Sequence, residues 1–251
     1  MQAICSDVHG NLEAFEAVLQ EIARQHVTEV ICLGDVVGYG PNPRECVDLA
    51  RGLGITLQGN HEQALLVQME GSTFSYRARD SLDWTRQQFS MRNDEERAQN
   101  GPRWDFLGSL RESFTSNSAL HVHGTPRDPI NEYLYPRDIY RPEKLEQMFE
   151  KIDWVCFVGH THVPGIWTED MIYLTRQQVN GRYRLGPKKA IINVGSVGQP
   201  RDGDPRASFV LRDDDTIFFR RVEYPMDTTV QKIRAIPELD PFLAERLQHG
   251  K

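Results

Sequence analysis

Five separated points of the sequence place metal-binding residue types beside glycine, directly after a short apolar run. They are Asp7 with His9; Gly34 with Asp35; Gly59 with Asn60 and His61; His123 with Gly124; and Gly159 with His160 and His162. Their carboxylate, amide and imidazole groups form a mixed oxygen and nitrogen donor set without thiolate, which suits manganese, iron, zinc, nickel or cobalt. The pattern therefore predicts a transition-metal site.

The spacing inside two of these groups supports that interpretation. Asp7 and His9 are two residues apart, and so are His160 and His162. In extended backbone, side chains two residues apart point the same way, so each pair can chelate one ion. One such residue alone has an ordinary explanation, such as a helix cap or a satisfied polar group. Five strands that end in the same ligand types have no explanation in packing.

The first 60 residues predict the elements that position the first three groups. Apolar runs at 3–6, 30–33 and 55–58 are expected strands, and the patterns at 15–22 and 44–53 are expected helices. This β-α-β-α-β order indicates parallel strands. Because parallel strands present their carboxyl ends at one edge of a sheet, where ligands bind in open α/β folds, the three groups must converge there.

The remaining sequence predicts a helical segment followed by mostly β structure. Residues 63–110 are polar and helical in pattern, and we expect them to form a helical cover. Further strands are expected at 119–122 and 154–158, with a helix at 143–151 between them. We expect hairpins joining 172–175 to 182–185 through Asn180 and Gly181, and 207–211 to 217–222, before an amphipathic helix from Met226. With no repeat or linker, residues 1–251 are expected to form one domain.

Composition narrows the class of function. The 251 residues include 39% hydrophobic and 26% charged residues, a composition that favours a folded globule over a disordered chain. The formal net charge of −7 provides no general basic surface for a nucleic-acid backbone. A nuclease is further disfavoured because no basic stretch is interleaved with aromatic residues. We therefore expect no stable nucleic-acid partner, whereas small phosphate substrates remain open because a metal pair can supply local positive charge.

The cysteines and the start of the sequence suggest a cytoplasmic location. Cys5, Cys32, Cys46 and Cys156 follow no zinc-finger or disulfide-framework spacing, so we expect buried thiols in a reducing compartment. The site pattern begins at Asp7, which leaves no room for a targeting segment. No run approaches the roughly 20 apolar residues that cross a bilayer, so no membrane association is expected.

Taken together, the five groups resemble the calcineurin-like metallophosphoesterases, and within that family the small bacterial and archaeal phosphodiesterase-like members. The matching blocks occur in the family's order, at residues 7–11 (DVHGN), 34–38 (GDVVG), 59–62 (GNHE), 123–126 (HGTP) and 159–162 (GHTH). Residues 193–200 (NVGSVGQP) resemble the family's closing loop. The resemblance implies an α/β fold, a four-layer αββα sandwich of two mixed sheets flanked by helices.

The resemblance also implies the role of each candidate residue. One metal ion would be bound by Asp7, His9 and His162, a second by Asn60, His123 and His160, and Asp35 would bridge them. The two divalent ions, with manganese first and iron, zinc, nickel or cobalt as alternatives, would share a hydroxide that acts as the nucleophile.

Three further residues are predicted to act on the substrate. His61 resembles the family's catalytic histidine, which stabilises phosphoryl charge or protonates the leaving alkoxide. Arg127 and Arg201 both follow site motifs, and we consider them candidates for bidentate binding of substrate phosphate.

Residues 38–41 (GYGP) help to narrow the class of substrate. They occupy the stretch in which protein phosphatases and dinucleoside polyphosphate hydrolases carry an arginine directed at phosphate, and they contain no arginine. The resemblance then favours a phosphodiesterase or phosphomonoesterase acting on small, nucleotide-like substrates. Dinucleoside polyphosphate hydrolysis and protein phosphatase activity remain alternatives. A catalytically silent scaffold of the same fold is a different class of alternative, but such scaffolds lack the catalytic histidine or some ligands, and here all eight positions match.

Overall fold

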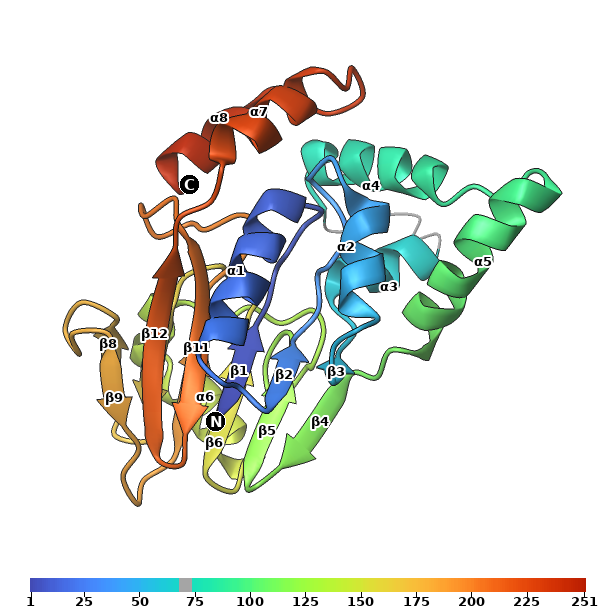
Figure 1. Ribbon diagram of the computed structural model, residues 1–251. Coiled ribbons are helices and arrows are strands. Elements are labelled where there is room, and N and C mark those ends of the chain that lie inside the picture. Colours follow the sequence, from blue (N-terminus) through green and yellow to red (C-terminus); the bar gives the residue numbers. More distant parts are fainter. Residues whose placement is uncertain (68–73) are drawn as a thin grey trace.

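The computed structural model describes residues 1–67 and 74–251, which contain two mixed six-stranded β-sheets flanked by helices (Figure 1). The first sheet has the order β3 (Ile55–Thr56), β2 (Glu29–Cys32), β1 (Gln2–Cys5), β11 (Ala207–Asp213), β12 (Thr216–Val222) and β9 (Arg182–Arg184). The second has the order β4 (Ser113–Ser116), β5 (Ala119–Val122), β6 (Val155–Val158), β10 (Ala190–Asn193), β7 (Gly165–Thr168) and β8 (Tyr173–Thr175).

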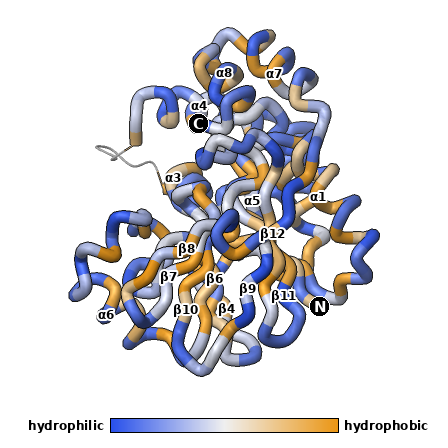
Figure 2. Tube along the Cα trace, turned by 90° about the vertical axis from the view of Figure 1, so that its left-hand side faces the viewer, coloured by the Kyte–Doolittle hydropathy of each residue, from blue (hydrophilic) through white to orange (hydrophobic). Residues whose placement is uncertain are grey.

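The alternation of side chains along the strands builds the layers. Ile4 of β1 and Phe157 of β6 point into one apolar cluster that both sheets share. The adjacent residue of each strand points to the outer face of its sheet. On the first sheet, Ala3 packs in the cluster that includes residues of α1 (Leu12–Arg24) and α2 (Pro43–Ala50). On the other sheet, Cys156 packs with α6 (Pro142–Glu150). Figure 2 shows α1 and α6 outside opposite sheets, which confirms the expected four-layer αββα arrangement.

The β-α-β-α-β prediction for the first 60 residues is confirmed. β1 pairs with β2, and β2 with β3, all parallel, with α1 and α2 as the two crossovers. Asn11 caps α1 by accepting a hydrogen bond from the Ala14 backbone N–H, 3.2 Å away. The antiparallel pairing of β11 with β12 is also as expected.

The predicted hairpin across Asn180 and Gly181 is wrong. β8 pairs with β7 in the second sheet, whereas β9 pairs with β12 in the first, so the chain crosses from one sheet to the other between them. Asn180 and Gly181 do form a turn, with φ of 50° and 70°. A turn signal reports a local reversal of the chain, but the pairing of its flanking strands depends on distant partners.

The helical segments expected at 63–110 and after Met226 are present, with more breaks than the pattern predicts. The first region contains α3 (Asn60–Leu66), α4 (Tyr76–Gln88) and α5 (Asp94–Ser109), while residues 68–73 lie outside the described part. The C-terminal region contains α7 (Met226–Arg234) and α8 (Phe242–His249). Pro237 and Pro241 lie between these two helices. Proline cannot donate the backbone hydrogen bond of a helix interior, so these residues explain the break.

All four cysteines are buried free thiols, as expected. Among the described residues, no helix is both long enough and apolar enough to cross a membrane.

Candidate metal centre

The seven predicted ligands converge at the carboxyl ends of strands from both sheets. Asp7 and His9 follow β1, Asp35 follows β2, Asn60 begins α3 after β3, His123 follows β5, and His160 and His162 follow β6. Each of these residues is at most 6% exposed. The protein thus buries two carboxylates, four imidazoles and one amide at the meeting edge of its two sheets.

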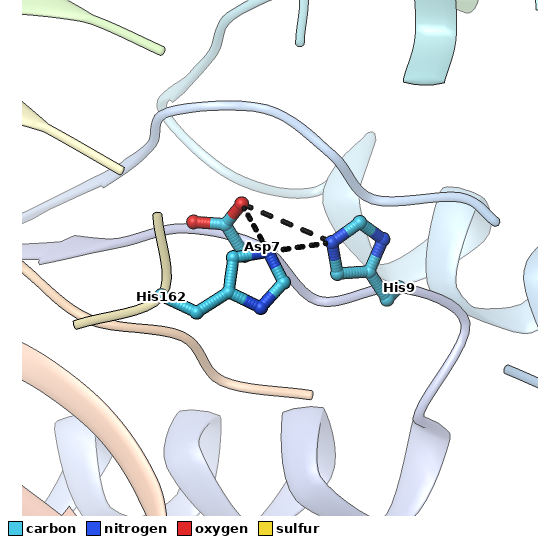
Figure 3. A group of neighbouring side chains, drawn as sticks. All are labelled: Asp7, His9 and His162. Atoms are coloured by element: carbon cyan, nitrogen blue, oxygen red, sulfur yellow. Dashed lines mark hydrogen bonds and ion pairs between the residues drawn. The ribbon is translucent and has the colours of Figure 1, made fainter. Parts of the chain in front are cut away.

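One group of facing donor atoms consists of Asp7, His9 and His162 (Figure 3). The Asp7 Oδ1 atom lies 3.2 Å from His162 Nε2 and 3.8 Å from His9 Nε2. The two histidine Nε2 atoms lie 3.1 Å apart.

A second group consists of Asn60, His123 and His160. His123 Nε2 lies 3.0 Å from Asn60 Oδ1 and 3.0 Å from His160 Nδ1. Asp35 lies between the two groups, because its Oδ2 atom is 3.3 Å from His123 Nε2 and 3.6 Å from His9 Nε2.

Whether these donors fit metal ions depends on which ring nitrogen of each histidine carries the proton. In three histidines, the ring nitrogen that faces away from the cluster lies beside a backbone carbonyl oxygen. His9 Nδ1 lies 3.1 Å from the Val37 carbonyl oxygen, and His162 Nδ1 lies 2.6 Å from that of Gln199. His160 Nε2 lies 3.2 Å from the Asn131 carbonyl oxygen. A carbonyl can only accept, so it holds the ring proton on that side and leaves a lone pair on the nitrogen that faces the cluster. The residues present therefore fit divalent cations.

Most of the donors are also in the charge state that metal binding requires. Burial lowers the pKa of His160 to about 3 and that of His9 well below its usual value, so both rings are neutral. Burial alone would favour neutral carboxyl groups, but the facing histidines hold the pKa of Asp7 and Asp35 below the usual range. Neutral imidazole and ionised carboxylate are the forms that coordinate metals.

His123 differs from the other histidines of the cluster. Burial opposes its charged form, but the carboxylates of Asp35, Asp7 and Glu62 raise its pKa to about 9. The His123 ring must therefore release a proton before it can act as a ligand, so a bound cation would replace a proton at this position.

The paired donors meet through sharp turns, and not through the extended backbone that their spacing predicts. Asp7, His9, Asp35, His160 and His162 have φ between 49° and 65°, in the left-handed region rather than in extended backbone. The members of each pair do meet, but the sharp turn after each strand brings them together. Such conformations in residues other than glycine are uncommon and cluster at functional sites.

Two of the glycines beside the donors are required by close packing. A Cβ atom on Gly159 would lie 2.6 Å from Asp7 Oδ2, and one on Gly59 would lie 2.9 Å from the Asp35 Cγ atom. Any side chain at these positions would displace a predicted ligand, which explains why glycine accompanies the donors at these two points.

Glu62 is a site residue whose role sequence reasoning missed. Its buried carboxylate accepts hydrogen bonds from the backbone N–H groups of Asp35, Val37 and Gly59, at 2.8, 3.1 and 2.9 Å. Burial and the nearby Asp35 raise the pKa of Glu62 to about 7. Glu62 thereby joins the loop that carries Asp35 to the start of α3. The available signal was its capping-box spacing, three residues after Gly59.

The 193–200 loop also supports the centre, through residues that were matched in sequence but given no role. Asn193 Nδ2 donates to the Gly159 carbonyl at 2.6 Å and to Thr161 Oγ1 at 2.9 Å. Ser196 Oγ donates to the Asp7 carbonyl at 2.8 Å. This loop therefore links the turn after β1 to the turn after β6.

His61 lies beside the two groups and contacts Asp35. Its backbone N–H donates to Asp35 Oδ1 at 2.9 Å, and its ring Nε2 lies 4.0 Å from Asp35 Oδ2. The ring packs against Tyr39 and Phe74, with centroid distances of 4.7 and 5.2 Å. Burial lowers the pKa of His61 to about 4, so its ring is neutral at neutral pH.

A cavity of about 260 Å³ opens over the donors. Its lining includes Asp35, Asn60, His61, His160 and His162, together with Tyr39, Phe74, Ser75, Ala78, Asn131, Tyr133 and Arg201. The cavity gives a ligand direct access to residues of the second group, to Asp35 and to His61.

The two arginine candidates have different positions. Arg201 lines the cavity, with its guanidinium 5.9 Å from the centre of the Tyr39 ring. Arg127 lies outside the cavity lining that the described residues form, and it donates to Glu132 Oε2 at 3.2 Å and to Gln147 Oε1 at 2.5 Å. These contacts occupy the guanidinium, so the position of Arg127 does not support the prediction that it binds substrate.

Comparisons with known proteins agree with this geometry. The family model described as "Calcineurin-like phosphoesterase" matches residues 3–164. An uncharacterised protein of Methanocaldococcus jannaschii is 36% identical over all of this chain and 98% of its own length. The crystal structure of a metallophosphoesterase from Sphaerobacter thermophilus is 37% identical, with a TM-score of 0.82 over 100% of this chain and 98% of its own.

A hypothetical protein of Pyrococcus horikoshii shares the fold at 19% identity, with a TM-score of 0.71 over 100% of this chain and 99% of its own. From the family model and these relatives, the chain belongs to the calcineurin-like metallophosphoesterases. The buried histidine and aspartate clusters are consistent with a dinuclear metal site in a member of that family.

Proposed function

We propose that the protein hydrolyses small phosphate esters, as a phosphodiesterase or a phosphomonoesterase that depends on two divalent metal ions. One observation carries the proposal: seven buried donors lie in two groups on either side of Asp35, and Asp35, Asn60, His160 and His162 among them line an open cavity. In this proposal Asp7, His9 and His162 hold one ion, and Asn60, His123 and His160 hold the other. When bound, two such ions neutralise phosphoryl charge and lower the pKa of water from 15.7 to about 7.

The residues around the donors suggest how the chain assists the reaction. His61 lines the cavity, and its neutral ring can donate an N–H hydrogen bond to the phosphoryl or leaving oxygen of an ester. Arg201 lines the same cavity and supplies a permanent positive charge for a phosphoryl oxygen. No serine or cysteine nucleophile is required.

The size of the cavity favours a small substrate. A volume of about 260 Å³ lies just below the range of roughly 300–1,000 Å³ that is typical of pockets for drug-sized ligands. A folded protein substrate would need an open surface instead. Residues 38–41 (GYGP) contain no arginine, and the family resemblance places the phosphate-directed arginine of protein phosphatases in this stretch, which also disfavours that alternative.

The test is hydrolysis of two chromogenic esters by protein loaded with manganese, iron, zinc, nickel or cobalt. We expect manganese-loaded protein to hydrolyse bis(p-nitrophenyl) phosphate, p-nitrophenyl phosphate or both. Asp35→Asn, which removes the shared carboxylate charge, serves as the blank. Binding of metal without hydrolysis of either ester under any of the five metals would support a silent scaffold and overturn the proposal.

A further inference from the structure

His61 differs from three other histidines of the centre in how its ring is held. The rings of His9, His160 and His162 each lie beside a backbone carbonyl that fixes their orientation. Within residues 1–67 and 74–251, His61 Nδ1 is buried without a hydrogen-bond partner. His61 Nε2 lies 4.0 Å from Asp35 Oδ2, which is too far for a hydrogen bond. Hydrogen bonds from the described residues therefore do not set the angle of this ring.

Packing against other rings sets the orientation of His61 instead. The Tyr39 ring lies 4.7 Å from the His61 ring between centroids, with planes 58° apart. The His9 ring lies at the same distance with planes 72° apart, and the Phe74 ring lies 5.2 Å away with planes 87° apart. The torsion that turns an imidazole ring has only broad preferences of its own, so the neighbouring rings decide its angle.

Gly38, the residue before Tyr39, closes the Nδ1 side of His61. A Cβ atom on Gly38 would lie 2.1 Å from His61 Nδ1, so the glycine backbone and the imidazole are in close contact. Residues 38–39 therefore border His61 at two places, with the glycine backbone beside Nδ1 and with the Tyr39 ring.

Tyr39 is itself held by three helices in an unusual backbone conformation. Its φ of 61° lies in the left-handed region, which is uncommon for a residue with a large side chain. The Tyr39 N–H donates to Ser81 Oγ of α4 at 3.2 Å. Figure 1 shows α4, α7 and α8 at the same end of the molecule, and the Tyr39 side chain packs against an apolar cluster of these helices that includes Trp84, Ile233, Leu243 and Leu247. Such a conformation persists only where the surrounding structure maintains it.

From these contacts we propose that Tyr39 is a positioning residue, whose ring holds the His61 imidazole at the angle from which it acts on the ester. The inference rests on the proposed function, because that function assigns the action on the ester to His61. Without the Tyr39 ring, the imidazole is free to turn about its Cβ–Cγ bond. A misplacement of about 1 Å at a reacting group can lower a rate by about 10²-fold.

Three variants of the manganese-loaded full chain test this inference, with a p-nitrophenyl ester that the wild type hydrolyses. Tyr39→Leu removes the ring and should lower kcat by about tenfold to a hundredfold, with kcat/KM falling equally. Tyr39→Phe keeps the ring and should have a kcat within about threefold of the wild-type value. Tyr140→Leu is the control, because Tyr140 is 82% exposed and lies outside this cavity. Wild-type kcat in Tyr39→Leu would overturn the inference, and so would an equal loss in Tyr39→Phe.

The same substitution in the His61→Ala background shows whether Tyr39 acts through His61. If one residue acts only through another, its removal has no further effect once the other is absent. We expect Tyr39→Leu to change the kcat of His61→Ala by less than about twofold. A further loss of about tenfold would show that Tyr39 supports the reaction by another route, which contradicts the inference.

Metal content separates an effect on His61 from an effect on the ligands. Tyr39 also contacts His9, a predicted ligand, with ring centroids 4.7 Å apart. Elemental analysis of Tyr39→Leu should give the wild-type metal content, and loss of a bound ion would place the effect on the metal site and refute the inference. If Tyr39→Leu does not fold, Tyr39→Met replaces it, because methionine fills the space without a ring.

The outcome for the proposed function is read separately. If the wild type hydrolyses an ester and Tyr39→Leu does so equally well, only this inference fails. If the wild type hydrolyses no ester, the proposed function fails, and crystal structures of the wild type and Tyr39→Leu decide the inference. We expect the His61 ring to turn in the variant, and an unchanged ring angle would show that Tyr39 does not position it.

Discussion

At the scale of single residues, the centre holds five donor residues in left-handed backbone. Such a conformation costs of the order of 1–3 kcal/mol for each residue other than glycine. Neighbouring loops maintain it through backbone hydrogen bonds, including Asp7 N–H to the Gly34 carbonyl at 3.0 Å and His9 N–H to the Asp35 carbonyl at 2.9 Å. These hydrogen bonds therefore link the turn after β1 to the turn after β2.

His61 has two conceivable roles, which its substitution separates. Its ring nitrogen is close enough to His9 and Asp35 to share a metal ion with them, although we propose that it acts on the ester. For His61→Ala we expect turnover to fall by about 10² to 10⁴ while metal content is largely retained. Turnover is measured with a p-nitrophenyl ester, and metal content by elemental analysis.

The exposed His249→Ala variant is the control for His61→Ala and should match the wild type in both measurements. Loss of one bound ion in His61→Ala would make His61 a ligand, and wild-type turnover would remove it from the reaction.

At the scale of elements, Glu62 joins α3 to the loop after β2. Replacement by Gln leaves one acceptor oxygen where the carboxylate accepted three backbone N–H groups. We expect Glu62→Gln to lower the free energy of unfolding by about 1–3 kcal/mol, because buried donors lose their partners. Urea unfolding measures this change. The exposed Glu150→Gln on α6 should have no effect, and equal stability of the two variants would refute the role of Glu62.

Another link between elements holds α7 against α1. Thr229 Oγ1 donates to Glu13 Oε2 at 2.8 Å, and Lys232 Nζ donates to Glu13 Oε1. Burial favours the neutral acid, but these bonds prevail and lower the pKa of Glu13 below its usual 4.5. The contribution of the Glu13 carboxylate to the free energy of unfolding is therefore complete above about pH 4.5. It is lost as the pH falls through the lower pKa that Glu13 has in the folded protein.

Glu13→Gln should therefore cost about 1 kcal/mol of unfolding free energy at neutral pH, and this cost should shrink as the pH falls below about 4. Urea unfolding of wild type and variant across that range measures the difference. Glu16→Gln, which changes an exposed residue of the same helix, is the control. A cost for Glu13→Gln that does not change with pH would show that the Glu13 charge contributes nothing.

At the scale of the whole molecule, each sheet supplies part of the centre, so metal binding should stabilise the assembled fold. Asp7, Asp35 and Asn60 come from the first sheet, and His123 and His160 come from the second. An ion that binds only the folded chain adds about 2.7 kcal/mol of stability when present at 100 times its dissociation constant. We expect a chelator to lower the Tm of manganese-loaded protein, and Asp35→Asn to show a much smaller change.

Thermal unfolding with and without the chelator measures this effect. Equal Tm values for wild-type protein in the two conditions would contradict a metal centre that spans both sheets.

Much of this fold and centre could be predicted because it depends on local pattern and chain order. The apolar runs located β1, β2, β5 and β6 to within a residue or two, and parallel pairing of β1 to β3 followed from the helices between them. The position of ligand types directly after these runs then required that they meet at a sheet edge. The identities of the candidate ligands were therefore readable in the sequence.

Only the tertiary structure decided what depends on distant partners. Arg127 and Arg201 both follow a site motif, yet one is bound to Glu132 and the other lines the cavity. The sequence around β8 and β9 indicates a turn, but packing assigns these strands to different sheets. The left-handed turns at the donors and the lining of the cavity also depend on contacts between segments far apart in the chain. Side-chain period and turn chemistry act over a few residues, whereas these features depend on how the two sheets pack.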